Sequence, residues 1–527
     1  MRERLVEDWL IRIHERGYDV AFCQTLLSRG LHVLRAGHSP TEHGKDVLVA
    51  TSDRKKVWGY QLKTGNFSQA DVTKHNEQLR MLVETRPIFP GLPPDFEYHP
   101  VLVTTGEFKE PAISLIKELN ESWRVRNLPA LTLINGRALL ADLLKLSEDF
   151  WPIALPAVRT LRSLFLVEGR GDFDPDAFSD LLMRLFAEKS GKNLGRQAAA
   201  ANLFASYLLG PFQENADHWS VFRGWTITAA SIAWAGGKSG TPEVVWFETY
   251  KLARDAARTA LIALHDEAKD EDKFRSRGME LDDYTRVRNV TTLAAVACVE
   301  LMSPAPVSTA PDIFLARVRQ FIADDRLLFW GEGAFSQHSL IIWFLEKRGA
   351  HGLAKEFLLR LTTLVARRSH ENSTDSLPDG YTSPDDCLTQ MLSDTPDTDT
   401  KKIIESHSLL PFIILCVRRQ MRSELGAIWV DITHARISIL RTEDPLDVLQ
   451  WSADDASENS HHFKEHSWRE LTEFAFRQDA DRLVSIFQKD TDFALMYLLT
   501  FQHRMMASLI KHLDEHVLPR VIHATRD

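Results

Sequence analysis

The stretch that decides the fold is residues 38–65, which read HSPTEHGKDVLVATSDRKKVWGYQLKTG. Two apolar runs, at 46–51 and 57–63, lie on either side of the polar turn SDRKK. Apolar runs separated by a short polar turn predict two antiparallel strands joined as a hairpin. In such a hairpin the start of the first strand lies opposite the end of the second.

Three polar residues stand out in these strands. Side chains of a strand alternate between two faces, so Gln61 and Lys63 share a face and Leu62 points to the other. Pairing of the two strands brings Asp46 near both. A carboxylate oxygen, an amide oxygen and a lysine at one point suit a hard divalent cation and an attacking water. Asp46, Gln61 and Lys63 are therefore the candidate catalytic residues.

The spacing of these residues resembles that of a known family. The pattern G-x-D, a spacer and Q-x-K is typical of the PD-(D/E)xK nuclease superfamily, most closely of its Mrr-like restriction-endonuclease branch. Here it reads Gly44-Lys45-Asp46 and Gln61-Leu62-Lys63. The flanking segments 22–50, 99–122 and 128–146 also look like the helices and strands of that family. The resemblance covers residues 1–147 and nothing beyond.

The resemblance implies a restriction-endonuclease-like α/β domain, with a mixed sheet flanked by helices. It also implies hydrolysis of DNA phosphodiester bonds that depends on Mg²⁺ or Mn²⁺. Asp46 would ligate the metal, and Gln61 would ligate it or orient the water. Lys63 would stabilise charge on the transition-state phosphate or help to deprotonate the water.

The remaining metal ligands are less well matched. An acid on the first helix often holds the metal in this family, and the aligned residue here is Gln24. Glu42, just before the G-x-D motif, is a further oxygen donor. Because one carboxylate binds metal more weakly than two, a second interpretation stays open. In it, the nuclease fold is kept as an inactive nucleic-acid-binding module.

The charge distribution bears on DNA binding. The chain has a net charge of −10, which argues against broad, nonspecific coating of DNA. Residues 1–150 contain 20 basic and 20 acidic residues, so a local basic rim is compatible with this domain. The candidates for this rim are Lys45, Arg54, Lys55, Lys56 and Lys74. An ordinary solvated turn explains the same residues equally well.

The first 150 residues alternate strands and helices, which predicts a mixed sheet with helices on both faces. We expect strands at 31–35, 46–51, 57–63, 100–105 and 130–134, and helices at 3–16, 19–29, 68–86, 110–126 and 136–146. Ser68 is the expected cap of the third helix.

After residue 150 the strand signal disappears, and apolar residues recur three and four apart. We therefore expect residues 151–527 to form an all-helical array, too long for one bundle and with room for two subdomains. Asp174 with Pro175 is an expected helix start, and Gly236 and Gly237 an expected helix end. This region would sense a signal, assemble the protein, or both.

The remaining composition places the protein in a reducing compartment. Four scattered cysteines predict no disulfide framework and no zinc site, and no apolar run approaches 18 residues. We expect a cytoplasmic protein without a membrane span. The architecture looks like bacterial restriction or anti-phage defence, with DNA as substrate, a homo-oligomer and a phage or host protein as trigger. The alternative is an interaction scaffold in which the N-terminal domain is an appendage.

Overall fold

The computed structural model forms two compact units, Met1–Ala257 and Arg258–Asp527, called unit 1 and unit 2 below. The structure describes residues 2–14, 17–36, 44–146, 155–167, 169–188, 194–270, 282–303, 311–323, 331–368, 406–439, 444–450, 459–462, 467–477, 483–501 and 506–517.

Unit 1 contains a five-stranded mixed sheet in the order β1-β2-β3-β4-β5. The first two pairs of neighbours are antiparallel, and β3–β4 and β4–β5 are parallel. The mixed sheet expected from the sequence is thus confirmed, and so is the hairpin between β2 and β3. The strands are β1 (His32–Ala36), β2 (Val47–Ala50), β3 (Lys56–Lys63), β4 (Glu97–Thr104) and β5 (Thr132–Ile134).

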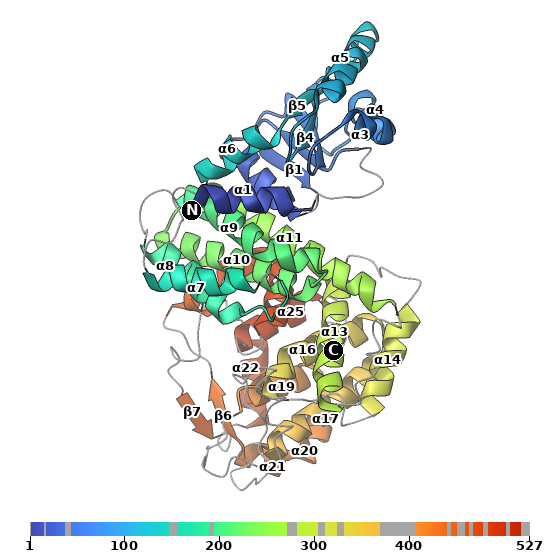
Figure 1. Ribbon diagram of the computed structural model, residues 1–527. Helices are drawn as coiled ribbons and strands as arrows, with labels where there is room; N and C mark the ends of the chain where they lie inside the picture. The colour runs from blue at the N-terminus through green and yellow to red at the C-terminus, as the bar shows by residue number, and fades with distance from the viewer. Residues whose placement is uncertain are drawn as a thin grey trace. The chain divides into compact units, whose positions relative to one another are not determined.

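Helices cover both faces of this sheet, as its apolar composition requires. The first elements are α1 (Arg2–Arg12), α2 (Asp19–Ser28), α3 (Gln69–Lys74), α4 (Asn76–Glu84), α5 (Glu110–Val125) and α6 (Gly136–Leu146). Val47, Val49 and Leu62 point to one face and pack into a core with α1, α2 and α6. Leu102 points to the other face and packs with α3, α4 and α5 (Figure 1).

The helix expected at 68–86 is divided in two, and that prediction was wrong in this detail. Ser68 caps α3 with a capping box, as expected. His75 then ends α3 and precedes α4, with a backbone that departs from helical geometry at ψ 12°. Val72, Leu79 and Leu82 nevertheless pack into one core. The spacing of apolar residues in the sequence reflects their burial in this one core. It does not show that the helix is interrupted at His75.

The carboxyl ends of β3, β4 and β5 are held together by close backbone contacts. Gly136 N donates to Gly106 O at 2.7 Å. Side chains at Gly106 and Gly136 would collide with the backbones of Gly65 and Thr105, respectively. The edge of the sheet at which β3 ends is therefore tightly packed, and a residue there has little freedom to move.

Unit 1 continues well beyond residue 150. Its further helices are α7 (Leu155–Leu166), α8 (Pro175–Glu188), α9 (Leu194–Glu214), α10 (His218–Ser239) and α11 (Phe247–Ala268), the last of which runs past the unit's end. Ala199, Leu203 and Tyr207 of α9 belong to the same core as α1, α2 and the sheet. The change from mixed to helical structure expected near residue 150 is therefore not where the compact units divide.

Two expectations about helix ends in this region had different outcomes. Asp174 Oδ1 accepts a hydrogen bond from Ala177 N at 2.9 Å, so the expected start of α8 is confirmed. The end predicted at Gly236 and Gly237 was wrong, because α10 continues to Ser239 and is capped by Gly240 in the left-handed conformation. A glycine inside a buried helix permits close packing, and Trp246 lies against Gly236.

Unit 2 is mostly helical, as expected. It contains α13 (Asp282–Met302), α14 (Pro311–Ala323), α16 (Phe335–Lys347), α17 (His351–Arg368), α19 (Leu409–Arg418), α20 (Arg422–Gly426), α21 (Trp429–His434), α22 (Trp468–Phe476), α23 (Ser485–Lys489), α24 (Thr491–Thr500) and α25 (Ala507–Val517). Short 3₁₀ helices lie at Glu243–Val245 in unit 1 and at Glu332–Ala334 and Pro445–Gln450 in unit 2.

Unit 2 also contains a two-stranded antiparallel sheet, so the expectation that residues 151–527 are entirely helical was wrong in this detail. Its strands are β6 (Arg436–Ile439) and β7 (Asn459–His462). The second strand reads NSHH and contains no alternating apolar residues, so its sequence does not predict a strand. Within the described residues, no helix is both long and apolar enough to cross a membrane.

Candidate functional site

Asp46 and Gln61 meet where β2 and β3 begin to separate. Gln61 Nε2 donates a hydrogen bond to Asp46 Oδ2 at 2.7 Å. Leu62 N donates to the same oxygen, also at 2.7 Å. Val47 pairs with Tyr60 in the hairpin, and Asp46 N donates to Tyr60 O at 2.8 Å. The expected approach of Asp46 and Gln61 is thus confirmed, whereas their catalytic roles stay predictions.

The amide oxygen of Gln61 is the most informative atom of this site. A carboxylate can only accept hydrogen bonds, so the amide nitrogen must face Asp46 and the oxygen must face elsewhere. Gln61 Oε1 is buried and has no hydrogen-bond partner among the described residues. A buried polar atom of this kind is costly unless a water or a cation satisfies it.

These donors fit a hard divalent cation. Mg²⁺ and Mn²⁺ prefer carboxylate and amide oxygens, completed by water or phosphate oxygens. Asp46 and Gln61 Oε1 supply the two protein ligands of that kind. Over the part of the chain that is described, no group of three or more His, Cys, Asp or Glu side chains is arranged to hold a metal. Mg²⁺ commonly keeps several water or phosphate ligands beside one or two from the protein.

Lys63 lies two residues beyond Gln61, at the end of β3, and pairs with Thr104 of β4. Its position in the strand puts it on the same face as Gln61, as expected. Lys63 is 7% exposed, Asp46 8% and Gln61 3%. All three candidate catalytic residues are therefore shielded from bulk solvent, which strengthens electrostatic interactions between them and any bound group.

Gln24 does not join this site, so its expected place beside the metal was wrong. Its amide oxygen accepts a hydrogen bond from Asn202 Nδ2 at 3.0 Å, and its amide nitrogen donates to Thr249 Oγ1 at 3.4 Å. Gln24 is 2% exposed. It thus connects α2 to α9 and α11. The other weak candidate ligand, Glu42, lies outside the described residues.

Asp19 is an acid that the sequence reasoning missed. It is the first residue of α2 and directly follows Tyr18, whose hydroxyl donates to Lys63 O at 2.9 Å. This contact brings the first turn of α2 to the end of β3 that carries Lys63. The available signal was an acid at a helix start, where carboxylates are common. Because that role is so common, it does not mark Asp19 as a site residue. We add Asp19 to the candidate acids at this edge.

Lys45 does not lie on an exposed rim, contrary to expectation. It is 1% exposed, and its Nζ donates to Met81 O of α4 at 3.2 Å. Its ammonium also lies 5.9 Å from the centre of the Tyr98 ring. Burial, and to a smaller extent the nearby Arg35, lowers the pKa of Lys45 from 10.5 to about 8. Lys45 is buried because this part of the chain packs against α4, whose Met81 carbonyl accepts the hydrogen bond from the ammonium group.

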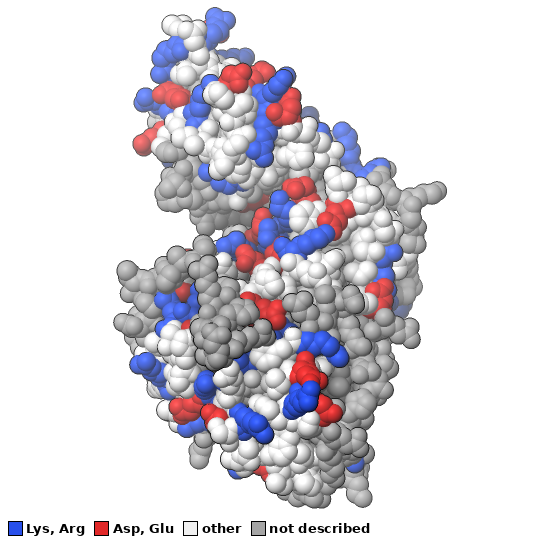
Figure 2. Space-filling view, turned by 180° about the vertical axis from the view of Figure 1, so that it is seen from behind, with Lys and Arg blue, Asp and Glu red and all other residues white. Residues whose placement is uncertain are grey.

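The turn that holds Arg54, Lys55 and Lys56 is exposed, which both a basic rim and an ordinary solvated turn require. Lys56 pairs with Glu97 at 3.6 Å, which offsets part of its charge. This turn lies at the far end of the hairpin, about 17 Å along β3 from Gln61. Lys74 is exposed at the end of α3. On the face of the molecule in Figure 2, basic and acidic side chains of the described residues are interspersed.

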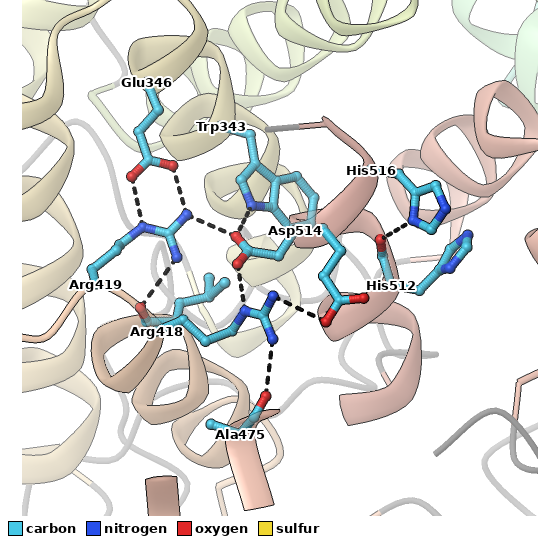
Figure 3. A network of polar contacts seen from close by, with 10 residues as sticks. Trp343, Glu346, Arg418, Arg419, Ala475, His512, Asp514 and His516 are labelled. Atoms are coloured by element: carbon cyan, nitrogen blue, oxygen red, sulfur yellow. Dashed lines mark hydrogen bonds and ion pairs between the residues drawn. The ribbon is translucent and has the colours of Figure 1, made fainter. Parts of the chain in front are cut away.

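Unit 2 contains a second dense cluster of polar side chains. Asp514 accepts hydrogen bonds from Arg418 Nε at 2.6 Å, Arg419 Nη2 at 2.8 Å and Trp343 Nε1 at 2.7 Å (Figure 3). Arg419 also forms a bidentate pair with Glu346, at 2.7 and 2.6 Å. Burial alone would raise the pKa of Asp514, but the two guanidinium groups hold it below its usual value. Both carboxylate oxygens of Asp514 accept hydrogen bonds from within unit 2, and its charge is balanced by the two arginines. We therefore interpret this cluster as structural.

Comparisons of the chain with protein-family models, with curated proteins and with solved structures found no significant match.

Proposed function

We propose that this protein is a metal-dependent DNA endonuclease whose N-terminal sheet has a restriction-endonuclease-like fold. Three features support the proposal: the mixed sheet with helices on both faces, the G-x-D and Q-x-K residues on neighbouring strands, and the contact between Asp46 and Gln61. The proposed setting is restriction or anti-phage defence in the cytoplasm. The helical region would detect a phage or host protein, assemble the protein, or both.

The observation that carries this proposal is the orientation of the Gln61 amide. Its nitrogen is committed to Asp46, and its oxygen is buried without a hydrogen-bond partner among the described residues. A purely structural glutamine in a strand would be expected to satisfy both ends. A glutamine that holds a cation or a water needs its amide nitrogen fixed by a hydrogen bond and its amide oxygen without a protein partner.

The roles of the residues follow from their chemistry. A bound Mg²⁺ or Mn²⁺ would supply Lewis acidity toward the scissile phosphate and toward water. Asp46 would bind the cation through its carboxylate, and Gln61 would fix that carboxylate and offer its own oxygen to the cation or the water. Lys63 would donate to a phosphate oxygen as negative charge develops there. The adjacent Leu62 N keeps Asp46 Oδ2 in place at 2.7 Å.

The burial of the three residues adds a requirement. A phosphodiester group must come within hydrogen-bond distance of Lys63 and of the cation, yet none of the three side chains is more than 8% exposed. Cleavage would therefore require that neighbouring chain segments move aside when DNA binds. This requirement fits an enzyme that is held inactive until triggered, which would protect the genome of the cell that makes it.

The proposal is tested by incubating supercoiled plasmid with the full-length protein in Mg²⁺, in Mn²⁺ and in EDTA. We expect nicking or linearisation with either cation and none in EDTA. Lys63→Met keeps the length of the side chain and removes its charge, and it should lower the rate by about 100-fold or more. Lys117→Met, at an exposed position of α5, is the matched control. Cation-independent cleavage, or equal loss in both variants, would contradict the assignment.

An inactive nucleic-acid-binding module is the competing candidate. The observation in its favour is that Gln24 is engaged by Asn202 and Thr249 and brings no acid to the site. Such a module would bind the same DNA without cutting it in any cation. Binding in a gel-shift experiment, together with intact plasmid in Mg²⁺ and Mn²⁺, would select this alternative.

A further inference from the structure

The carbonyl group of Lys63 is held from two directions. Thr105 N donates to it at 3.2 Å, as part of the parallel pairing between β3 and β4. The hydroxyl of Tyr18 donates to it at 2.9 Å, and Tyr18 belongs to the core formed by one face of the sheet with α1, α2 and α6. Tyr18 is 1% exposed, so this hydrogen bond is shielded from competing water. The residue that carries the candidate catalytic amine is thus fixed by a side chain distant in sequence.

The helix that carries Tyr18 is itself fixed. Tyr18 directly precedes α2, and Gln24 of α2 is bonded to Asn202 of α9 and to Thr249 of α11. Asn202 Nδ2 also donates to Thr249 O at 2.9 Å. All three of these polar residues are at most 5% exposed. Because buried hydrogen bonds are directional, α2 cannot slide or rotate on α9 without breaking them.

We propose that Tyr18 is a positioning residue, whose hydroxyl fixes the backbone at the end of β3 and thereby the direction in which the Lys63 side chain leaves the strand. The consequence for catalysis rests on the proposed nuclease function. A lysine side chain is long, so a small rotation of the backbone at Lys63 displaces its amine by much more. Misplacement by about 1 Å can cost about 100-fold in rate.

Tyr98 offers a matched control within the same unit. Its hydroxyl donates to Leu82 O at 2.7 Å, and the residue is 7% exposed. Tyr98→Phe therefore removes the same kind of buried hydrogen bond as Tyr18→Phe. The two bonds differ in what they hold, because Leu82 belongs to α4 and Lys63 carries the candidate amine. A merely structural role for Tyr18 predicts the same behaviour for both variants.

The kinetic test compares DNA cleavage by the full-length wild type, Tyr18→Phe and Tyr98→Phe. We expect Tyr18→Phe to lower kcat about tenfold or more with little change in KM, because Lys63 acts on charge that develops in the transition state. Tyr98→Phe should keep both constants within about twofold of the wild type. Its melting temperature should fall about as far as that of Tyr18→Phe, because each variant loses one buried hydrogen bond. Equal kcat in the two variants would overturn the inference.

Hydrogen exchange gives a second readout that does not depend on activity. Peptides from residues 62–66 should exchange faster in Tyr18→Phe than in the wild type, whereas Tyr98→Phe should leave them unchanged. If the wild type fails to cut DNA, the proposed function fails and this exchange measurement alone decides the positioning role. Unchanged exchange at residues 62–66 in Tyr18→Phe would overturn it, whatever the activity.

Discussion

The amide of Gln61 can donate a hydrogen bond to Asp46, which the carboxylate of a glutamate at this position could not do. Gln61 Nε2 lies 2.7 Å from Asp46 Oδ2 and donates to it. A glutamate there would bring two negative charges equally close, which is unfavourable unless one is protonated or a cation lies between them. Gln61 therefore keeps the two strands joined without a bound cation. Its oxygen has no hydrogen-bond partner among the described residues, and in the proposed function it is the atom offered to the cation or the water.

Lys45 allows a prediction about pH and stability. Its pKa falls from 10.5 to about 8 on folding, mainly because of burial. The cost of keeping it charged is therefore present in full below about pH 8 and disappears as the pH rises toward 10.5. Lys45→Met should raise the free energy of unfolding at pH 7 by about 1 kcal/mol or more. Its advantage should shrink between pH 8 and 10.

Thermal or urea denaturation of both proteins across this pH range measures the effect. Lys117→Met, which removes an exposed lysine of α5, is the control and should leave the free energy of unfolding nearly unchanged. The same Lys45 variant tests the rim expected from sequence, because a buried lysine contributes little to DNA contact. A less stable Lys45→Met protein, or one that loses most of its DNA affinity, would contradict the placement of this residue.

At the scale of elements, local patterns predicted the sheet and its hairpin well. Two apolar runs around a polar turn were enough to predict the hairpin. Because strand side chains alternate between faces, Gln61 and Lys63 share a face, and the pairing brings Asp46 near Gln61. The patterns failed where distant contacts decide. Nothing local to Gln24 distinguishes a metal ligand from a residue bonded to Asn202, which is 178 positions away. Lys45 is a similar case, because α4 buries it only in the folded chain.

The contacts of α9 and α11 with α2 predict where unit 1 can be cut. A fragment of residues 1–150 would expose the apolar face of α1 and α2 that packs against Ala199, Leu203 and Tyr207. It would also leave the buried Gln24 amide without its partners. We expect this fragment to aggregate or to melt without cooperativity, because the lost burial amounts to several kcal/mol. A fragment of residues 1–268, which ends with α11, should be soluble and melt cooperatively.

Size-exclusion chromatography and calorimetry of the two fragments test this expectation. They also bear on control of the nuclease by the helical region. Activity lost in the shorter fragment alone would reflect loss of the fold. A change in DNA cleavage between residues 1–268 and the full-length chain would isolate the effect of the remaining helices. A well-folded fragment of residues 1–150 would contradict the structural role of α9 and α11.

At the scale of the whole molecule, unit 2 contains a buried ionic cluster whose disruption we expect to destabilise it. Asp514 is fully buried between Arg418 and Arg419. Asp514→Asn keeps the shape and removes the charge, so two buried guanidinium groups lose the counterion that they share. We expect a loss of about 3–5 kcal/mol in the free energy of unfolding of this unit. Glu515→Gln is the control, since Glu515 is 38% exposed and pairs with Arg418 only at 3.2 Å.

The sign of the pH dependence follows from the lowered pKa of Asp514. Its ionised form stabilises unit 2 above the ordinary carboxyl pKa, and this stabilisation is lost as the pH falls through the lowered value. The wild type should thus lose stability on acidification more steeply than Asp514→Asn. Denaturation monitored by tryptophan fluorescence, with Trp343 beside the cluster, follows the transition. Equal stability of Asp514→Asn and Glu515→Gln would show that the cluster does not hold the unit together.

The sequence predicted the helical character of the second half but not what its helices hold in place. The residues that form the Asp514 cluster come from α16, α19 and α25, so no local window contains the pattern. Self-association and a protein trigger remain proposals that concern surfaces and partners. Double-strand cleavage by a single-site domain needs two copies or two visits, which is the physical reason to expect a symmetric dimer.

The most direct test of the central claim is the rate of plasmid cleavage by Asp46→Asn beside that of the wild type at the same Mg²⁺ concentration. Asparagine can still accept the hydrogen bonds from Gln61 and Leu62 through its oxygen, so the fold should persist while the charged ligand is lost. Asp180→Asn, which removes an exposed carboxylate of α8, is the control. We predict that Asp46→Asn cuts at least about 100-fold more slowly and that Asp180→Asn cuts like the wild type. Cleavage by Asp46→Asn at the wild-type rate would contradict the claim that this site is catalytic.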